Sequence, residues 1–294
     1  MSFLFWIAVL PALILIAYIY RKDKVEKEPI SLLVRLFLGG ALSTVTAMIF
    51  GQLLDYPLHA FFEEGTLAYL LVENFLVVAL VEEGGKFFFL KKFSWKNPAF
   101  NYTFDAIVYG VVTALGFAAV ENVLYVYEGG LGVAVMRALL SVPGHAIDGV
   151  FMGIFYGAAK RCQIRYDKAG CGRNLRLALI IPTIMHGFYD FSLSSGSDLA
   201  FVGFLIYEVV ITILAIVLIN KNSKNDQLLT APVTMDAPGM LPAGTAPEAM
   251  PSLQNRNLPR RQNLPSEASP EHPNEAPSFE VDGNDRNKTG GFEA

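Results

Sequence analysis

The stretch 70–90, LLVENFLVVALVEEGGKFFFL, decides how this chain folds. It is apolar over about 20 residues, the length that crosses a lipid bilayer as a helix. Near its C-terminal end it nevertheless carries Glu82, Glu83 and Lys86. Ionisable groups are costly in hydrocarbon, so within a span they face the protein interior, and they are functional by default but not by necessity. The stretch therefore predicts a membrane protein with charged groups inside its helical bundle.

The composition agrees with a membrane protein. Of the 294 residues, 53% are hydrophobic and 17% are charged, whereas soluble domains carry about 25% charged residues. The net charge of -4 gives no sign of a nucleic-acid partner. The two cysteines, Cys162 and Cys171, lie in a basic loop at a spacing that matches no metal motif, so we expect free thiols.

Seven segments have the length and polarity of membrane spans. The first has no basic residue before its apolar run and no small-residue cleavage site, so it reads as an anchor and not as a cleavable signal peptide. The expected fold is an all-α polytopic membrane protein with about seven transmembrane helices. They are expected at 3–20, 30–54, 66–90, 104–126, 133–159, 174–194 and 199–220.

The distribution of positive charge predicts the topology. Of the 16 Lys and Arg in residues 1–220, 13 lie in the connections 21–29, 91–103 and 160–173 or at the adjoining Arg176. The alternate connections, 55–65, 127–132 and 195–198, contain none. Because basic loops stay in the cytoplasm, we expect the N-terminus outside and the C-terminus inside. Arg137, within a span near the outer boundary, is expected to extend toward the interface.

The chain changes character after residue 220. Residues 221–294 hold 10 of the 16 prolines and have no periodic apolar pattern. Such a composition predicts a disordered cytoplasmic tail. The expected organisation is thus a membrane domain over 1–220 and a Pro-rich tail over 221–294.

Polar residues recur inside other spans. Glu82 and Lys86 are four residues apart, so on a helix they share a face, and Glu83 is three from Lys86. By itself this set could also be a pair that stabilises helix packing. Glu121, beside Asn122, follows a small-residue stripe that permits close helix approach and so points into the bundle. The stripe is formed by Gly110, Ala114 and Ala118.

Two of the four histidines lie within spans, each beside a carboxylate. His145 begins a stripe of glycines at 149, 153 and 157, and Asp148 is close enough in sequence to orient its imidazole. His186 and Asp190 are four residues apart on one helix face. A lone histidine here would more often be a satisfied core residue. Two of them, with three glutamates on other spans, favour a polar cavity.

This set of residue types suits hydrolysis. Two histidines and a carboxylate with an open position form a catalytic zinc site, in which a further glutamate serves as general base. Without a metal, a glutamate and a histidine could activate water directly. Serine catalysis has less support, because no intramembrane G-x-S-x-G motif is present.

The sequence resembles the PrsW family of intramembrane proteases, relatives of the CAAX prenyl endopeptidase superfamily. The resemblance covers about residues 1–220 and rests on four motifs in order. They are E-E-x-x-K from Glu82 to Lys86, F-x-x-x-E from Phe117 to Glu121 followed by Asn122, the motif around His145, and HGFYD from His186 to Asp190. The wider superfamily has histidine where Glu121 stands, so mechanisms assigned to that histidine do not carry over.

The resemblance implies an integral-membrane endopeptidase that acts on membrane-anchored protein substrates. One branch of the family makes the first cut in an anti-sigma factor. The family is classed as metalloproteases, which implies a zinc cofactor. The resemblance also implies a location in a bacterial cell membrane. As a hypothesis, Glu82 is the general base, Glu83 is a second catalytic carboxylate, and Lys86 tunes the charge of both.

The remaining motif residues complete this hypothesis. His145 and His186 bind a metal or its activated water, and Glu121 is a third ligand or the partner of a histidine. Asn122 belongs to the catalytic set, and Asp148 and Asp190 orient the two histidines.

Two other function classes stay open at this stage. Buried Glu, Lys and His also build proton- or cation-coupled transporters, and Glu208 in the last span would fit such a relay. No inverted repeat of the kind typical of transporters is apparent. A non-catalytic receptor or scaffold is the third possibility.

Overall fold

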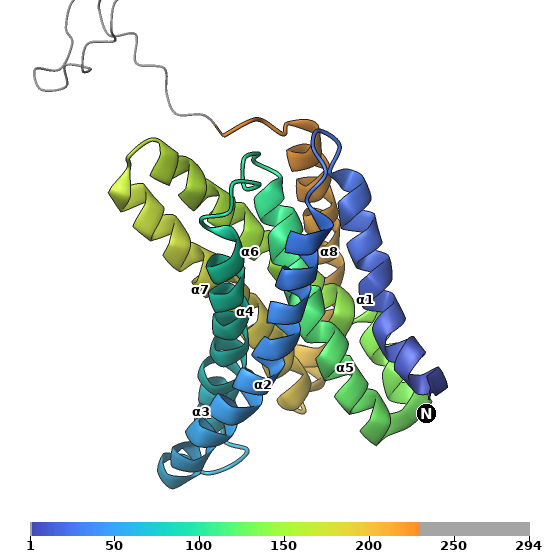
Figure 1. Ribbon diagram of the computed structural model, residues 1–294. Coiled ribbons are helices and arrows are strands. Elements are labelled where there is room, and N and C mark those ends of the chain that lie inside the picture. Colours follow the sequence, from blue (N-terminus) through green and yellow to red (C-terminus); the bar gives the residue numbers. More distant parts are fainter. Residues whose placement is uncertain (1, 230–294) are drawn as a thin grey trace, which may run out of the picture. The chain divides into compact units, whose positions relative to one another are not determined.

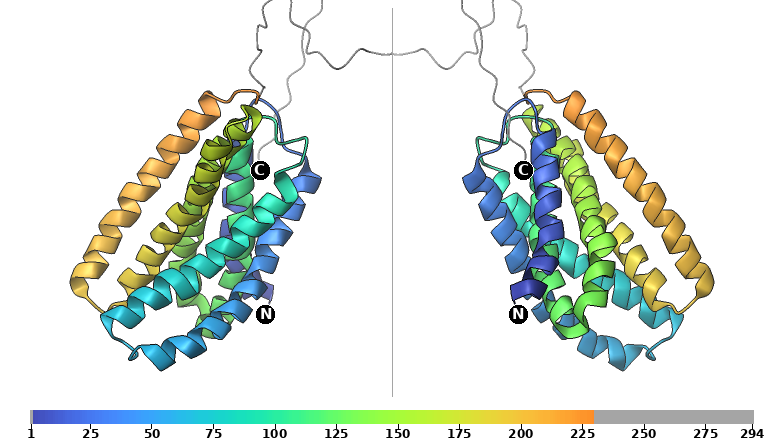
Figure 2. Two further views of the ribbon diagram at one scale, coloured as in Figure 1. Left: turned by 90° about the vertical axis from the view of Figure 1, so that its left-hand side faces the viewer. Right: turned by 90° about the vertical axis from the view of Figure 1, so that its right-hand side faces the viewer.

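Helices form nearly all of the described part of the chain, residues 2–229 of a computed structural model. Figures 1 and 2 show the long helices side by side in one bundle, with the connections at its two ends. The helices are α1 (Ser2–Lys22), α2 (Ile30–Phe61), α3 (Leu67–Val72), η1 (Glu73–Ala79), α4 (Leu80–Ser94), α5 (Asp105–Leu139), α6 (Ser141–Ile164), α7 (Lys168–Ser194) and α8 (Asp198–Lys224).

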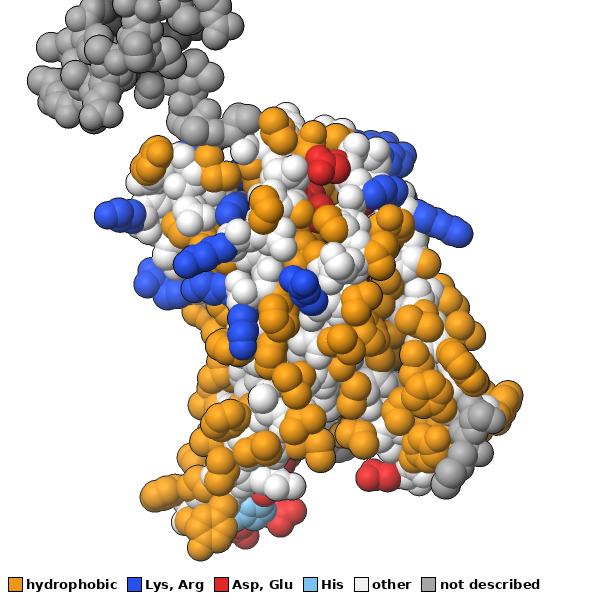
Figure 3. Space-filling view, in the orientation of Figure 1, with side chains coloured by type: hydrophobic (Ala, Val, Ile, Leu, Met, Phe, Trp, Pro, Cys, Tyr) orange, Lys and Arg blue, Asp and Glu red, His pale blue; other side chains and the backbone are white. Residues whose placement is uncertain are grey.

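The all-α membrane fold expected from the sequence is confirmed. Within residues 2–229, five stretches are long and apolar enough to cross a membrane, and one of them, Asp105–Ile164, contains both α5 and α6. The expected span at 66–90 is divided into α3, η1 and α4, none of which reaches 18 residues by itself. Figure 3 shows hydrophobic side chains over the body of the molecule and Lys and Arg gathered at one end.

Helix α5 is the central element of the bundle. It packs against α1, α2 and α6, and its first four turns are almost entirely buried. Its contact with α6 is glycine-mediated, as the small-residue stripes predict: a Cβ at Gly149 would lie 2.8 Å from the Gly110 carbonyl oxygen, and one at Gly153 would lie 2.5 Å from that of Ala106. The absence of side chains lets the two backbones touch.

The C-terminal end of α5 agrees with the prediction only in part. We expected a connection at 127–132 and a new span from 133. The helix is interrupted by a kink within this connection, at Gly130, whose φ is 72°, but the helical piece that follows ends already at Leu139. Glycine adopts this conformation without the steric cost that a Cβ brings. The kink redirects the segment 131–139, and α6 begins only at Ser141.

The segment η1 is a π-helix that directly precedes the Glu82–Lys86 motif. π-Helical turns are rare and frequently occur at functional sites. Helix α7 packs closely against η1, since a Cβ at Gly187 would lie 2.5 Å from the Phe75 ring. Asn74 donates hydrogen bonds to the Leu70 carbonyl (2.7 Å) and to Ser194 Oγ on α7 (3.0 Å). Figure 2 shows the path from α3 to α4 running obliquely to its neighbours.

The end of α8 is tied to the connection before α5. Leu228 forms an isolated antiparallel bridge with Tyr102, and Asp226 accepts hydrogen bonds from Phe104 N (2.8 Å) and Thr103 Oγ1 (2.9 Å). The helix thus extends to Lys224, beyond the boundary expected at 220. The expected disordered tail falls mainly on residues 230–294, which lie outside the described part of the chain.

Candidate active site

Lys86 lies at the centre of the charged motif. Its side chain and that of Glu83 are fully buried, and Lys86 Nζ lies 2.7 Å from Glu83 Oε1 and 3.5 Å from Glu82 Oε2. The ammonium group also donates to His145 Nδ1 at 3.2 Å and lies 4.0 Å from the centre of the Phe117 ring. One buried cation therefore joins α4 to α5 and α6, and it compensates the charge of both glutamates.

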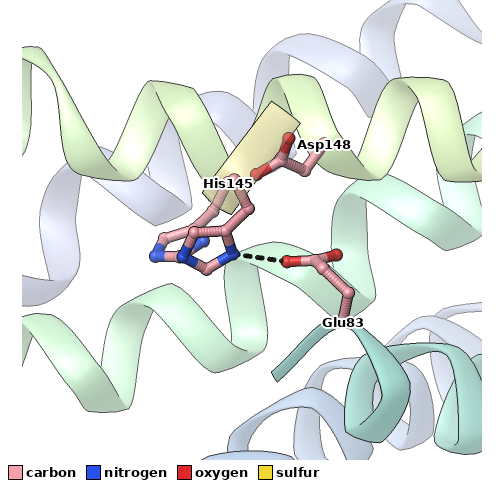
Figure 4. Close-up of side chains that lie close together, drawn as sticks. Glu83, His145 and Asp148 are labelled. Atoms are coloured by element: carbon pink, nitrogen blue, oxygen red, sulfur yellow. Dashed lines mark hydrogen bonds and ion pairs between the residues drawn. The ribbon is translucent and has the colours of Figure 1, made fainter. Parts of the chain in front are cut away.

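His145 on α6 bridges two of the predicted motifs. Because Lys86 donates to its Nδ1, the proton of a neutral ring lies on Nε2, which then donates to Glu121 Oε2 at 2.8 Å. No hydrogen bond joins His145 to Asp148 within residues 2–229. The two side chains nevertheless point to a common centre with Glu83, as Figure 4 shows.

His186 on α7 is held by three carboxylates. Its Nδ1 lies 2.9 Å from Glu83 Oε1, and its Nε2 lies 3.2 Å from Asp190 Oδ2 and 3.7 Å from Glu82 Oε2. Its ring centre is 5.2 Å from that of His145. The structure thus brings together side chains that are up to 108 positions apart in the printed sequence, from Glu82 to Asp190.

Arg137 is a site residue that the sequence reasoning missed. Instead of extending toward the membrane surface, its guanidinium binds Glu121 Oε2 at 2.7 Å and Asn122 Oδ1 at 3.0 Å. It also stacks over the Tyr125 ring at 4.2 Å. The kink at Gly130 makes this possible, because it turns the segment that carries Arg137 back toward the preceding helix. The Gly129-Gly130 pair was the available signal.

Asn122 contributes to the site through its hydrogen bonds and does not line the cavity described below. It is fully buried, and its Nδ2 donates to the Ala8 carbonyl on α1 at 2.6 Å. It therefore fixes both α1 and Arg137 relative to α5.

Most of these groups line one cavity of about 450 Å³. Polar residues dominate its wall, among them Asn74, Arg137 and Asp190 together with Glu82, Glu121 and both histidines. Glu82 Oε2 accepts no hydrogen bond from any described residue, although it is buried. This oxygen lies 3.5 Å from Lys86 Nζ and 3.7 Å from His186 Nε2, so a cation and an imidazole flank it without a hydrogen bond.

The donor atoms fit a metal ion in two overlapping sets. The first comprises Glu83, His145, Asp148 and His186, all buried, and the second comprises Glu82, Glu121 and His145. Within each set the ligand atoms lie within 4.8 Å of one another. Nitrogen and carboxylate ligands of this kind suit zinc. In the first set a metal would take over contacts that Lys86 now makes to Glu83 and His145.

Glu208 stands apart from this cavity. It lines a much smaller cavity of about 10 Å³ between α6, α7 and α8, with Asp148, Tyr189 and Tyr207. Asp148 and Tyr189 also line the large cavity, whereas Glu208 does not.

Comparison with known proteins identifies the family. The profile of the PrsW family of intramembrane metalloproteases matches residues 28–219. No solved structure matches the chain.

Three relatives, each named Protease PrsW, align over most of their own length. The Oceanobacillus iheyensis protein is 34% identical over 74% of this chain and 94% of the relative. The Halalkalibacterium halodurans protein is 37% identical over 62% and 80%, and the Bacillus subtilis protein 34% over 65% and 82%. The chain therefore belongs to the PrsW family of intramembrane metalloproteases.

Proposed function

We propose that this protease hydrolyses peptide bonds at the cavity between α4, α5, α6 and α7, with Glu82 as general base. The observation that carries the proposal is the position of Glu82 Oε2. It accepts no hydrogen bond from the described residues and lies 3.7 Å from His186 Nε2, in a wall where His145 and His186 lie side by side. Glu82 takes a proton from a water molecule, which attacks the carbonyl carbon of the scissile bond. The proton then passes to the leaving amine as the C–N bond breaks.

In this proposal the other residues hold Glu82 and the histidines in place. Lys86 keeps Glu83 charged in the protein interior, and Glu83 and Asp190 fix the ring of His186. Glu121 acts as the partner of His145, because its carboxylate bridges His145 and Arg137.

The resident metal of this proposal is zinc. His145 and His186 would hold it, with Glu83 or Asp148 as the carboxylate ligand. When bound, zinc supplies Lewis-acid polarisation of the substrate carbonyl. We propose no other cofactor.

The proposed setting is a bacterial cell membrane, with the N-terminus outside and the basic connections in the cytoplasm. The clustering of Lys and Arg at one end supports this orientation (Figure 3). The proposed substrates are membrane-anchored proteins, and an anti-sigma factor is a specific candidate.

The experiment compares membranes of cells that express the wild type, Glu82→Gln or Glu208→Gln, with new protein N-termini identified by mass spectrometry. Glutamine keeps the size of the side chain but cannot take a proton, so Glu82→Gln should lower cleavage by about 10² to 10⁴. Glu208→Gln, outside the large cavity, should cleave like the wild type.

Two further measurements accompany this comparison. His186→Ala should be as severe as Glu82→Gln, and the double variant no worse than either, because members of a site act as a unit. Metal analysis of the purified protein should find zinc, with less in His186→Ala. Near wild-type cleavage by Glu82→Gln would refute the assignment of the base.

A further inference from the structure

A second cavity of about 310 Å³ meets the first at Glu82. The two cavities share four wall residues: Val78, Glu82, Glu121 and Tyr125. Glu82 thus lies between the two cavities and lines both of them. When a peptide bond lies at Glu82, the residues on its two sides therefore enter different cavities.

The second cavity exists because α2 and α5 diverge. Their backbones touch at Gly40, where a Cβ would collide with the Thr113 carbonyl, and at Gly116, where it would collide with that of Phe37. The cavity is lined by α2 from Thr44 to Gly51 and by α5 from Phe117 to Glu128, beyond this contact. Figure 1 shows the two helices running apart in this direction.

The walls of the two cavities differ in chemistry. The first is lined mostly by polar residues, as described above. Apolar residues such as Ala47, Met48, Val77 and Leu124 make up more than half of the wall of the second, and its polar residues are Thr44, Glu128 and the shared Glu82, Glu121 and Tyr125. Met48 and Leu124 are exposed on the outer surface of the bundle, by 52% and 41%. In a membrane-spanning bundle such a surface faces lipid, so the second cavity opens toward hydrocarbon.

We propose that the cavity between α2 and α5 is a substrate subsite for an apolar side chain next to the scissile bond. The enzyme then selects bonds at which an apolar, membrane-embedded stretch meets a polar stretch. The apolar residue enters from the lipid between α2 and α5, while the polar side extends past Asn74 and Arg137. Hydrolysis adds the hydroxyl of water to the carbonyl carbon and its proton to the amine. This inference rests on the proposed role of Glu82.

Gly51 offers a direct test, because a Cβ there meets no atom within 4 Å and the residue lines the subsite. Gly51→Phe should fill the subsite without moving the backbone. Gly203→Phe on α8 is the matched control, since a Cβ at Gly203 also meets nothing within 4 Å and the residue lines neither cavity. Ala47→Leu narrows the same subsite less and serves as a second variant.

The probe is a proteome-derived peptide library, incubated with the purified full-length protein and read by mass spectrometry for the residues that flank each cut. The wild type and Gly203→Phe should prefer a large apolar residue on one side and polar residues on the other. Gly51→Phe should lose at least about tenfold in relative cleavage of bonds flanked by Leu or Phe, because a pocket discriminates by about 10- to 200-fold per methylene gained or lost. Ala47→Leu should shift the preference in the same direction.

The failures are distinguishable. If Gly51→Phe and Ala47→Leu cut the library with wild-type preferences, the proposed subsite is overturned while the proposed function stands. A library that the wild type leaves uncut contradicts the proposed function and removes the subsite with it. Equal melting temperatures of the variants and the wild type would confirm that a changed preference reflects the cavity and not the fold.

Discussion

Replacement of Lys86 by methionine tests the charged centre of the site. Lys86 and Glu83 are both fully buried and 2.7 Å apart, so the substitution leaves the Glu83 carboxylate without its nearest cation. Removal of one partner from a buried ion pair costs about 3–5 kcal/mol. We expect the upper part of this range, because Lys86 also contacts Glu82 and the ring of Phe117. The ratio of folded to unfolded protein should fall by roughly three to four powers of ten.

The double variant Lys86→Met/Glu83→Gln separates the ion pair from simple packing. Methionine retains most of the apolar stem, and glutamine removes the uncompensated charge while it can still hydrogen-bond to His186 Nδ1. The double variant should therefore recover most of the lost stability without recovering proteolysis. Lys91→Met, at an exposed position on the same helix, should change stability by no more than about 0.5 kcal/mol.

The assay is equilibrium unfolding in mixed detergent micelles, followed by circular dichroism, for the wild type and all four variants, including the single Glu83→Gln. A loss below about 1 kcal/mol for Lys86→Met would refute the reasoning. Glu83 would then not depend on Lys86 for charge compensation.

Three other predictions follow from the geometry. Gly149→Leu should prevent α5 and α6 from touching and abolish accumulation of folded protein. Gly203→Leu, where a Cβ meets open space, should fold. Size-exclusion chromatography would distinguish these outcomes. Arg137→Met should reduce cleavage and Arg137→Lys should restore it only in part, because lysine cannot bind Glu121 and Asn122 together through one planar group; initial rates measure this. Burial raises the pKa of Asp23 to about 6 and that of Glu28 to about 7. The stability due to their protonated forms is fully present below the pKa values of the unfolded chain, 3.8 and 4.5, and is lost as the pH rises through about 6 and 7. The melting temperature should therefore fall over this pH interval. It should fall less in the double variant Asp23→Asn/Glu28→Gln.

The helical path and its close contacts were accessible from the sequence. Runs of apolar residues indicated the spans. The stripes at Gly110 and Gly149 predicted close helix packing, and the structure shows that the two stripes pack against each other. The grouping of Glu83, His145 and His186 was also expected, because ionisable side chains inside a membrane have few stable partners other than one another.

The parts that escaped prediction depend on backbone geometry that no residue pattern marks clearly. The π-helical turns at 73–79 have an ordinary apolar sequence, so nothing distinguished them from an α-helix. Arg137 has the position of a residue at a membrane boundary, and its role emerges only from the direction that the chain takes after Gly130. The second cavity likewise arises from the angle between two helices and not from any motif.

The π-helix η1 has a consequence for how this sequence can vary in length. A π-helical stretch holds an additional residue within a rise that an α-helix would fill with fewer, so loss of one residue between 73 and 79 would convert it to ordinary α-helix. Every side chain before the deletion would then turn by about 100° relative to those after it. Tyr69 and Asn74 could no longer keep their present neighbours while Glu82 keeps its own. The spacing between the start of α3 and Glu82 should therefore tolerate substitutions far better than deletions.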